Sequence, residues 1–93
     1  MHVTHNAQQS RFEIVGEGGL AVLEYRREGR VWDLHRTYVP DRMRGMGVAG
    51  VLARTALEHI REEGGSIRPS CSYIESFVGK NPEFAALIEN RSP

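Results

Sequence analysis

The chain has 93 residues, in which 12 Lys and Arg side chains balance 12 Asp and Glu side chains. This length supports one domain with a modest core, and the balanced charge excludes a general electrostatic attraction to nucleic acids or acidic membranes. The single cysteine, Cys71, cannot form an internal disulfide, and no stretch approaches the ~20 apolar residues of a membrane span, so we expect a cytoplasmic protein without nucleic-acid or membrane partners.

The N-terminal half predicts a tail followed by three strands. Met1–Ser10 is polar and predicts a flexible tail, so the single domain is expected over residues 11–93. Strands are predicted at Arg11–Val15, Leu20–Arg26 and Val31–Val39, because these segments alternate in polarity or are rich in β-branched and aromatic residues. Short glycine-containing turns join the three segments, which indicates an antiparallel meander.

The clearest element is one long helix. It is predicted from Arg44 or Gly45 to Glu63, and Gly64 and Gly65 provide its C-cap and the following turn. Its apolar residues recur at helical spacing and form one continuous stripe. The members of this stripe are Ala49, Leu52, Ala53, Ala56, Leu57 and Ile60.

The C-terminal part contains shorter elements. Ser66–Ser70 predicts a fourth strand, which could lie parallel to the third because a helix joins them. Cys71–Val78 predicts a short helix, and Glu83–Glu89 predicts another with Pro82 in its first turn. The expected fold class is therefore α+β, with a mainly antiparallel four-stranded sheet, the long helix packed across one face and short C-terminal helices.

The segment Pro40–Gly50, between the third strand and the long helix, has the composition of a phosphate-binding loop. Gly45 and Gly47 let the backbone approach a ligand, and the first amides of a helix have no partner within it. A helix N-terminus carries about half a positive charge and suits phosphate, and Arg42 and Arg44 add fixed cations. We interpret the segment as a pyrophosphate cradle; the alternative is a loop that only turns the strand into the helix.

Taken literally, the glycines match the dinucleotide fingerprint G-x-G-x-x-G. That fingerprint needs a strand leading directly into the first glycine and a parallel strand ending in an acidic residue about 20 positions on. Pro40–Arg44 intervenes here, and too few residues follow Gly50 for a doubly wound sheet, so an NAD-type site is disfavoured. A P-loop is excluded because no Lys-Ser or Lys-Thr follows the glycines.

The residues around the glycines resemble a different motif. Arg42 to Gly47 fits Arg/Gln-x-x-Gly-x-Gly/Ala, which is similar to the acetyl-CoA-binding motif of the GCN5-related N-acetyltransferases (the GNAT superfamily). Three further blocks resemble the very short, single-domain class of that superfamily: Tyr38-Val-Pro-Asp, Pro69-Ser-Cys-Ser-Tyr and Asn81-Pro-Glu-Phe. In one departure, that class commonly has His-Thr where this chain reads Arg36-Thr37, with His35 one place earlier.

The resemblance implies an acetyltransferase. Acetyl-CoA would be the co-substrate, no metal would be needed, and the acetyl group would pass to a primary amine of a small molecule or a protein. The pyrophosphate would lie on the amides of residues 44–49, and the pantetheine arm beside the end of the third strand. The implied CoA-binding residues are Tyr38, Val39, Arg42, Arg44, Gly45, Met46, Gly47, Val48, Ala49 and Asn81.

Acyl transfer to an amine also needs a neutral amine. An ammonium with a pKa near ~10.4 costs ~4.6 kcal/mol to deprotonate at pH 7, so a base or a desolvating pocket is required. Asp33 and His35 lie on one face of the third strand, with Thr37 beyond them, and are candidates for this base; an exposed polar sheet face is the alternative.

The resemblance adds two further candidates near the thioester. It implies Cys71 as an acetyl acceptor or a lining residue, with pure packing as the alternative. It also implies Tyr73 as the acid that protonates the departing CoA thiolate, with packing beside the pantetheine as the alternative.

Two other functions stay open at this point: a non-catalytic acyl-CoA-binding or protein-interaction module that keeps the cradle, and a nucleotide-binding fragment. The sequence does not identify the acceptor. A chain this short lacks the extra helices that wall the acceptor pocket in larger relatives, so we expect an open site suited to a bulky or peptide acceptor. An exposed strand edge would permit a homodimer as well as a monomer.

Overall fold

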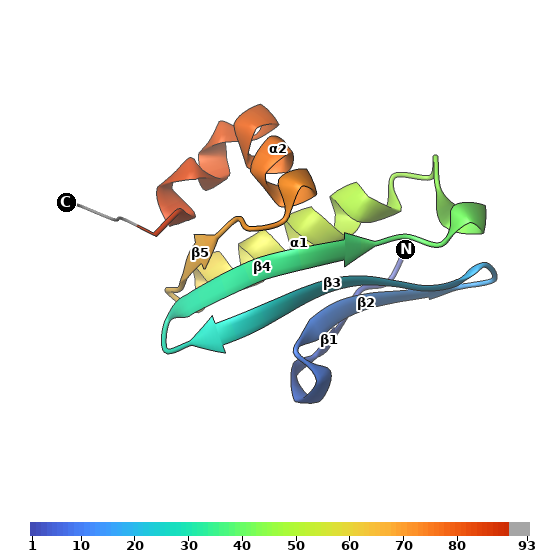
Figure 1. Cartoon of the computed structure of the whole chain (residues 1–93), viewed down its shortest axis with the longest axis horizontal. Coiled ribbons are helices and arrows are strands. Elements are labelled where there is room, and N and C mark those ends of the chain that lie inside the picture. Colours follow the sequence, from blue (N-terminus) through green and yellow to red (C-terminus); the bar gives the residue numbers. More distant parts are fainter. Residues whose placement is uncertain (90–93) are drawn as a thin grey trace.

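The computed structural model describes residues 1–89. Its strands form one sheet in chain order, and α1 runs along this sheet with α2 and η3 beside it (Figure 1). The strands are β1 (Thr4–Asn6), β2 (Arg11–Gly16), β3 (Gly19–Glu28), β4 (Val31–Tyr38) and β5 (Ser66–Arg68). The α-helices are α1 (Val48–Glu62) and α2 (Ser72–Lys80), and the 3₁₀ helices are η1 (Ala7–Gln9), η2 (Asp41–Met43) and η3 (Pro82–Leu87).

The α+β class is confirmed, but the sheet has five strands where four were predicted. The additional strand is β1, which lies inside Met1–Ser10, the segment expected to be a flexible tail. It pairs antiparallel with β2. His5 explains the difference: its ring stacks on Phe12 at 4.3 Å between centroids, and its Nε2 lies 2.7 Å from the Tyr25 hydroxyl. The polar composition of the tail hides this contact, because a histidine ring can bury one face and still bond a polar group.

The meander of β2, β3 and β4 is antiparallel as predicted, and β5 lies parallel to β4. β5 is shorter than the predicted Ser66–Ser70, since Pro69 has no N–H to continue the ladder. Beyond it, the backbone N–H of Cys71 donates to the Leu34 carbonyl at 2.8 Å. The start of α2 is therefore fastened to β4. Residues 90–93, at the end of the expected domain of 11–93, lie outside the described residues.

The long helix α1 begins at Val48, later than the predicted Arg44 or Gly45. The reason is conformational, because Gly45 and Gly47 have φ of +79° and +74°. The left-handed backbone of Gly47 makes it the N-cap of α1 and cannot belong to a right-handed helix. At the other end, Gly64 has φ of +71° and terminates the helix as predicted.

The apolar stripe of α1 packs against one face of the sheet. Its buried members are Leu52, Ala53, Ala56, Leu57 and Ile60, and the sheet and the C-terminal elements contribute Phe12, Leu23, Trp32, Leu34, Ile67, Ile74 and Phe84. Ala49, predicted in the stripe, is only half-buried, and Val48 is buried in its place. No helix within residues 1–89 is long and apolar enough to cross a membrane.

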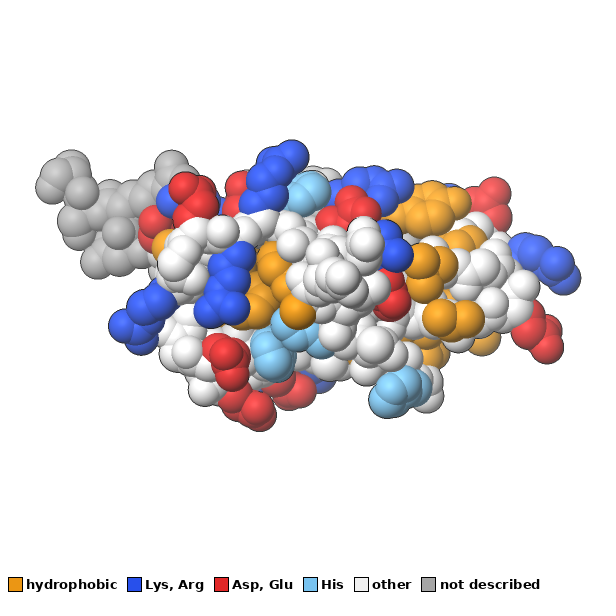
Figure 2. All heavy atoms as spheres, turned by 90° about the horizontal axis from the view of Figure 1, so that it is seen from below, with side chains coloured by type: hydrophobic (Ala, Val, Ile, Leu, Met, Phe, Trp, Pro, Cys, Tyr) orange, Lys and Arg blue, Asp and Glu red, His pale blue; other side chains and the backbone are white. Residues whose placement is uncertain are grey.

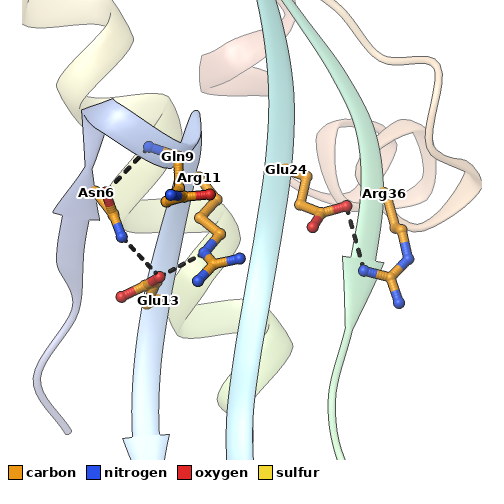
Figure 3. A network of polar contacts seen from close by, with 6 residues as sticks. All are labelled: Asn6, Gln9, Arg11, Glu13, Glu24 and Arg36. Atoms are coloured by element: carbon orange, nitrogen blue, oxygen red, sulfur yellow. Dashed lines mark hydrogen bonds and ion pairs between the residues drawn. The ribbon is translucent and has the colours of Figure 1, made fainter.

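The opposite face of the sheet is polar. Arg11 pairs with Glu13 on β2, and Arg36 of β4 pairs with Glu24 of β3 at 3.2 Å (Figure 3). Asn6 of β1 extends this network by donating to Glu13 at 3.1 Å. The hydrogen bonds from Arg11 and Asn6 lower the pKa of the Glu13 carboxyl.

A β-bulge in β4 changes which side chains face α1. Glu24 lies opposite Arg36 while the next residue, Tyr25, lies opposite Leu34, so His35 is an additional residue in β4. Simple alternation along β4 would place Trp32, Leu34 and Tyr38 on one face. Instead, the bulge reverses the alternation after His35, and Tyr38 lies on the polar face, where the Arg36 guanidinium covers its ring at 5.2 Å.

Candidate active site

A crevice of about 280 Å³ opens at the N-terminus of α1. It lies between the end of β4, the loop that follows η2 and the first turn of α2, at the point where the loop from β4 enters α1 (Figure 1). Its lining residues are Val39, Met43, Arg44, Gly45, Gly47, Val48, Ala49, Gly50 and Tyr73. The structure thus brings together seven of the predicted site residues: Val39, Arg44, Gly45, Gly47, Val48, Ala49 and Tyr73.

Gly45 and Gly47 occupy positions in this crevice where the backbone adopts a left-handed conformation. A Cβ at Gly45 or Gly47 would meet no atom within 4 Å, so a positive φ, and not crowding, is what favours glycine there. The first intrahelical bond of α1 runs from the Val51 N–H to the Gly47 carbonyl at 3.1 Å. The amides of the residues between them have no carbonyl partner within the helix and lie at the crevice, where an anion would be stabilised.

Arg44 holds the loop against the end of β4. Its Nε donates to the Val39 carbonyl at 3.0 Å, and its Nη1 lies 3.2 Å from Asp41 Oδ1. The side chain is largely exposed, so it keeps a solvent-accessible positive charge at the rim of the crevice.

Four predicted CoA-binding side chains lie elsewhere. Arg42 and Met46 line a separate cavity of about 310 Å³ beside the β2–β3 hairpin, and Figure 2 shows hydrophobic side chains gathered at that end of the molecule. The Asn81 side chain is engaged within the fold, since it donates to the Phe77 carbonyl at 2.8 Å and accepts from Arg54 at 2.9 Å. Tyr38 is on the polar sheet face, so only its backbone lies near the crevice.

Cys71 is half-buried where β4 meets α2. It is the N-cap residue of α2, and its Sγ lies 3.4 Å from the Thr37 hydroxyl. Burial raises the pKa of the Cys71 thiol, but the Thr37 hydroxyl and the backbone amides of Ile74 and Tyr73 together outweigh burial and bring the pKa below its ordinary value. The ionised fraction of Cys71 at neutral pH is therefore larger than that of an ordinary cysteine.

Tyr73 lies on the opposite wall of the crevice from the glycines. A Cβ at Gly50 would lie 3.6 Å from its hydroxyl, which places that hydroxyl over the first turn of α1. Burial, and then the negative charge of Cys71, raise the pKa of the Tyr73 phenol. Tyr73 consequently stays protonated at neutral pH and can donate a proton or a hydrogen bond.

The two candidate bases, Asp33 and His35, are not hydrogen-bonded to Cys71 or Tyr73 within the described residues. Asp33 lies opposite Arg26 and Arg68 in register, and its Oδ1 is buried without a hydrogen-bond partner in the part of the chain that the structure describes. His35 is the bulge residue, so the expected common face of Asp33, His35 and Thr37 does not exist. Among residues 1–89, no hydrogen bond joins Asp33 or His35 to Cys71 or Tyr73.

Simple alternation along the strand places Thr37 on the wrong face of the sheet. The sequence signal is weak: Trp32 and Leu34 alternate as core residues, and then Arg36 breaks the apolar pattern at the next expected position. That break is consistent with a bulge but does not identify one.

Within the described residues, no group of three or more His, Cys, Asp or Glu side chains could hold a metal ion.

The family follows from a sequence comparison. The sequence model described as GCN5-related N-acetyl-transferase matches residues 11–87. The chain belongs to this family. Protein NATD1 of Mus musculus is 39% identical over 85 residues, which cover 88% of this chain and 77% of the mouse protein. Protein NATD1 of Homo sapiens is 38% identical over 85 residues, covering 88% of this chain and 75% of the human protein.

A solved structure shares the GNAT fold of this chain. The solution structure of a GCN5-like protein from Staphylococcus aureus superposes with a TM-score of 0.75 and covers 98% of this chain and 90% of that protein. The two sequences are 23% identical, so this likeness supports the fold alone. The short GNAT fold predicted from the sequence is confirmed.

Proposed function

We propose that the chain is an acetyl-CoA-dependent N-acetyltransferase that acetylates a primary amine of a small molecule or a protein. The observation that carries this proposal is the crevice at the mouth of α1, where two left-handed glycines present unpartnered amides opposite the Tyr73 hydroxyl. Membership in the GNAT family supports the reaction class. Acetyl-CoA would supply the acetyl group as a thioester.

The residues of the crevice fit the two parts of this co-substrate nearest the thioester. The amides at the start of α1 and the Arg44 guanidinium would bind the pyrophosphate, because both present positive charge at the rim. The backbone at Val39 would pair with the amides of the pantetheine arm, as an edge strand pairs with an added strand. Arg44 would then leave the Val39 carbonyl, which it occupies here.

Tyr73 and Cys71 would carry the proton and acyl chemistry. Attack on the thioester carbonyl breaks the carbon–sulfur bond of acetyl-CoA, and the departing thiolate would take the proton of the Tyr73 hydroxyl. Cys71, two residues before Tyr73 in the chain and with a lowered pKa, would be the nucleophile. If Cys71 attacks first, the acetyl group passes to its Sγ. A neutral amine then attacks the acetyl carbonyl, the bond from Sγ to the acetyl carbon breaks, the Cys71 thiolate re-forms, and the proton lost by the amine would return to the Tyr73 phenolate.

A second function is favoured by one observation. Asp33 and His35 are not hydrogen-bonded to the Cys71 and Tyr73 pair, so no side chain is aligned as the base for an incoming ammonium among the described residues. A non-catalytic acyl-CoA-binding or protein-interaction module is the corresponding alternative. The cytoplasmic location, the absence of nucleic-acid and membrane partners and the choice between monomer and homodimer stay predictions.

The experiment that separates the two functions measures acetyl transfer directly. Acetyl-CoA is incubated with the full chain and a panel of amines that includes peptides with free N-termini, lysine peptides and small polyamines, and acetylated products are detected by mass spectrometry. The proposal predicts an enzyme-dependent acetylated product. Saturable CoA binding with no product from any amine would favour the binding module, and neither binding nor product would overturn both.

The role of Cys71 is tested in the same assay. If the acetyl group passes through Sγ, a quenched reaction without amine contains protein that carries one acetyl group on Cys71. Cys71→Ala would then lose both this adduct and turnover. Retention of full turnover by Cys71→Ala would show that the amine attacks acetyl-CoA directly and that Cys71 only lines the site.

A further inference from the structure

We propose that Thr37 is a positioning residue whose hydroxyl holds the Cys71 sulfur in place and stabilises it as a thiolate. This inference rests on the proposed function, in which Cys71 lies beside the acetyl thioester, but its test requires neither acetyl-CoA nor an amine. Thr37 touches the reacting atoms only through Cys71.

The β-bulge is what brings the two side chains together. Thr37 lies opposite Leu23, which is a core residue, so Thr37 is on the sheet face that carries α1 and α2. Without the additional residue at His35, alternation from Leu34 would place Thr37 on the polar face with Asp33. The bulge thus turns one hydroxyl toward the start of α2, where Cys71 begins the helix.

The sulfur is fixed from the other side by the backbone. The Cys71 N–H donates to the Leu34 carbonyl at 2.8 Å, and the Cys71 carbonyl accepts from the Glu75 N–H at 3.0 Å as α2 begins. These bonds set the position of the Cys71 Cα relative to β4, and the Thr37 Oγ1 lies 3.4 Å from Sγ. A hydroxyl at this distance can donate to a thiolate or accept from a thiol.

The charged and titratable neighbours of Cys71 contribute little to its ionisation, which leaves the contact with Thr37 as a main influence on it. On α2, the titratable neighbour that interacts with the Cys71 charge is Tyr73, which is neutral at physiological pH. On β4, the charged neighbour in sequence is Arg36, which pairs with Glu24 on the opposite sheet face. The remaining groups that favour the thiolate are the Thr37 hydroxyl, the first amides of α2 and the Thr37 backbone, and they lower the pKa of Cys71 against the effect of burial.

The test is the pH dependence of Cys71 alkylation. Cys71 is the single cysteine of the chain, so iodoacetamide labelling reports on it alone. Wild type should react with a midpoint below that of an ordinary thiol. Thr37→Val keeps the shape and removes the hydroxyl, so its midpoint should rise and its rate at neutral pH should fall about tenfold, the size expected for a lost hydrogen bond to a charged group. Thr37→Ser should restore the wild-type profile.

Controls separate this role from a structural one. Thr4→Val, on the exposed edge strand β1, makes the same chemical change far from the sulfur and should leave the profile unchanged. A folded Thr37→Val variant with the wild-type midpoint would overturn the inference, as would a wild-type midpoint at the ordinary value. If Thr37→Val does not fold, Thr37→Ala removes the same hydroxyl, and a folded Thr37→Ala variant with the wild-type midpoint would overturn the inference as well. Acetyl transfer could still be present in each of these cases, so failure here does not imply failure of the proposed function.

Discussion

The environments of Tyr73 and Cys71 fit the acid and nucleophile roles proposed for them. Burial keeps the Tyr73 phenol protonated, whereas hydrogen bonds to the Cys71 sulfur favour its ionised form. The negative charge of Cys71 itself raises the pKa of Tyr73, so an ionised Cys71 supports the protonated state of Tyr73. Two neighbouring titratable groups pushed in opposite directions are typical of acid and base assignments in enzymes.

The first residue-scale prediction concerns Tyr73. Tyr73→Phe removes the proton donor and keeps the ring, so kcat should fall by about a hundredfold, while the Kd for acetyl-CoA should change little. Steady-state kinetics with calorimetric binding measures both quantities. Tyr25→Phe is the matched control, since the Tyr25 hydroxyl meets His5 away from the crevice. Wild-type kcat in Tyr73→Phe would remove Tyr73 from the mechanism.

The second residue-scale prediction concerns His5, which fastens β1 to the domain. Burial, and then His59 and Arg27, lower the pKa of His5 below 6.5, and Glu63 opposes this shift only in part. The unfolded chain therefore binds the proton first as the pH falls, and the stabilisation present above pH 6.5 is lost below it.

Urea unfolding at about pH 7.5 and about pH 5.5 tests this effect. The wild-type midpoint should fall at the lower pH, and His5→Phe, which keeps the stacking on Phe12, should show a smaller fall. His2→Asn changes an exposed histidine and should behave as wild type. An equal fall in His5→Phe and wild type would show that other groups cause the pH dependence.

At the scale of elements, the N-terminus of α1 is fixed by the conformation of Gly47. Alanine at φ of +74° costs about 1–2 kcal/mol, so Gly47→Ala should destabilise the fold by that amount and weaken acetyl-CoA binding as the loop relaxes. Thermal unfolding and titration calorimetry measure the two effects.

Gly79 offers a matched control for this change. It lies inside α2, and a Cβ there would meet no atom within 4 Å, so Gly79→Ala should stabilise the helix by about 0.5–1 kcal/mol and leave acetyl-CoA binding unchanged. Unaltered binding in Gly47→Ala would indicate that the left-handed N-cap does not shape the site.

The elements also show which parts of the fold the sequence can predict. The stripe of α1 and the strands β2 to β4 were predictable because burial of one face imposes a regular period. The start of α1 was not predictable, because it depends on the backbone conformation of the glycines before it, which leaves the apolar period of the helix intact. The bulge at His35 was not predictable either, because it interrupts the alternation of the strand only once. β1 was missed because its anchor, His5, is a polar residue, and only the fold shows that its ring stacks on Phe12 while its Nε2 meets the Tyr25 hydroxyl.

The same distinction holds for the site. The position of Gly45, Gly47 and Arg44 at the crevice was predictable because one short loop contains all three residues. The placement of Arg42, Met46 and Asn81 away from the crevice was not, since it depends on contacts with the β2–β3 hairpin and with Arg54. The link between Thr37 and Cys71 joins positions 34 residues apart, and only the folded sheet establishes it.

At the scale of the whole molecule, the chain combines the crevice at the N-terminus of α1 with few surrounding elements. The helices α1 and α2 lie on one face of the sheet, and the opposite face is an ion-paired polar surface (Figure 3). No further helix covers that face within residues 1–89. This arrangement supports the expectation of an open site and a bulky or peptide acceptor, which the amine panel tests by comparing peptides with small amines.

The central claim is that the amides at the mouth of α1 bind the diphosphate of acetyl-CoA. Isothermal titration of the full chain with CoA and with acetyl-CoA tests it most directly, with Gly47→Ala and Gly79→Ala measured alongside. We predict saturable one-site binding that is weakened in Gly47→Ala and unchanged in Gly79→Ala. An absence of heat with either compound at about millimolar concentration, where even weak specific binding is detected, would contradict the claim.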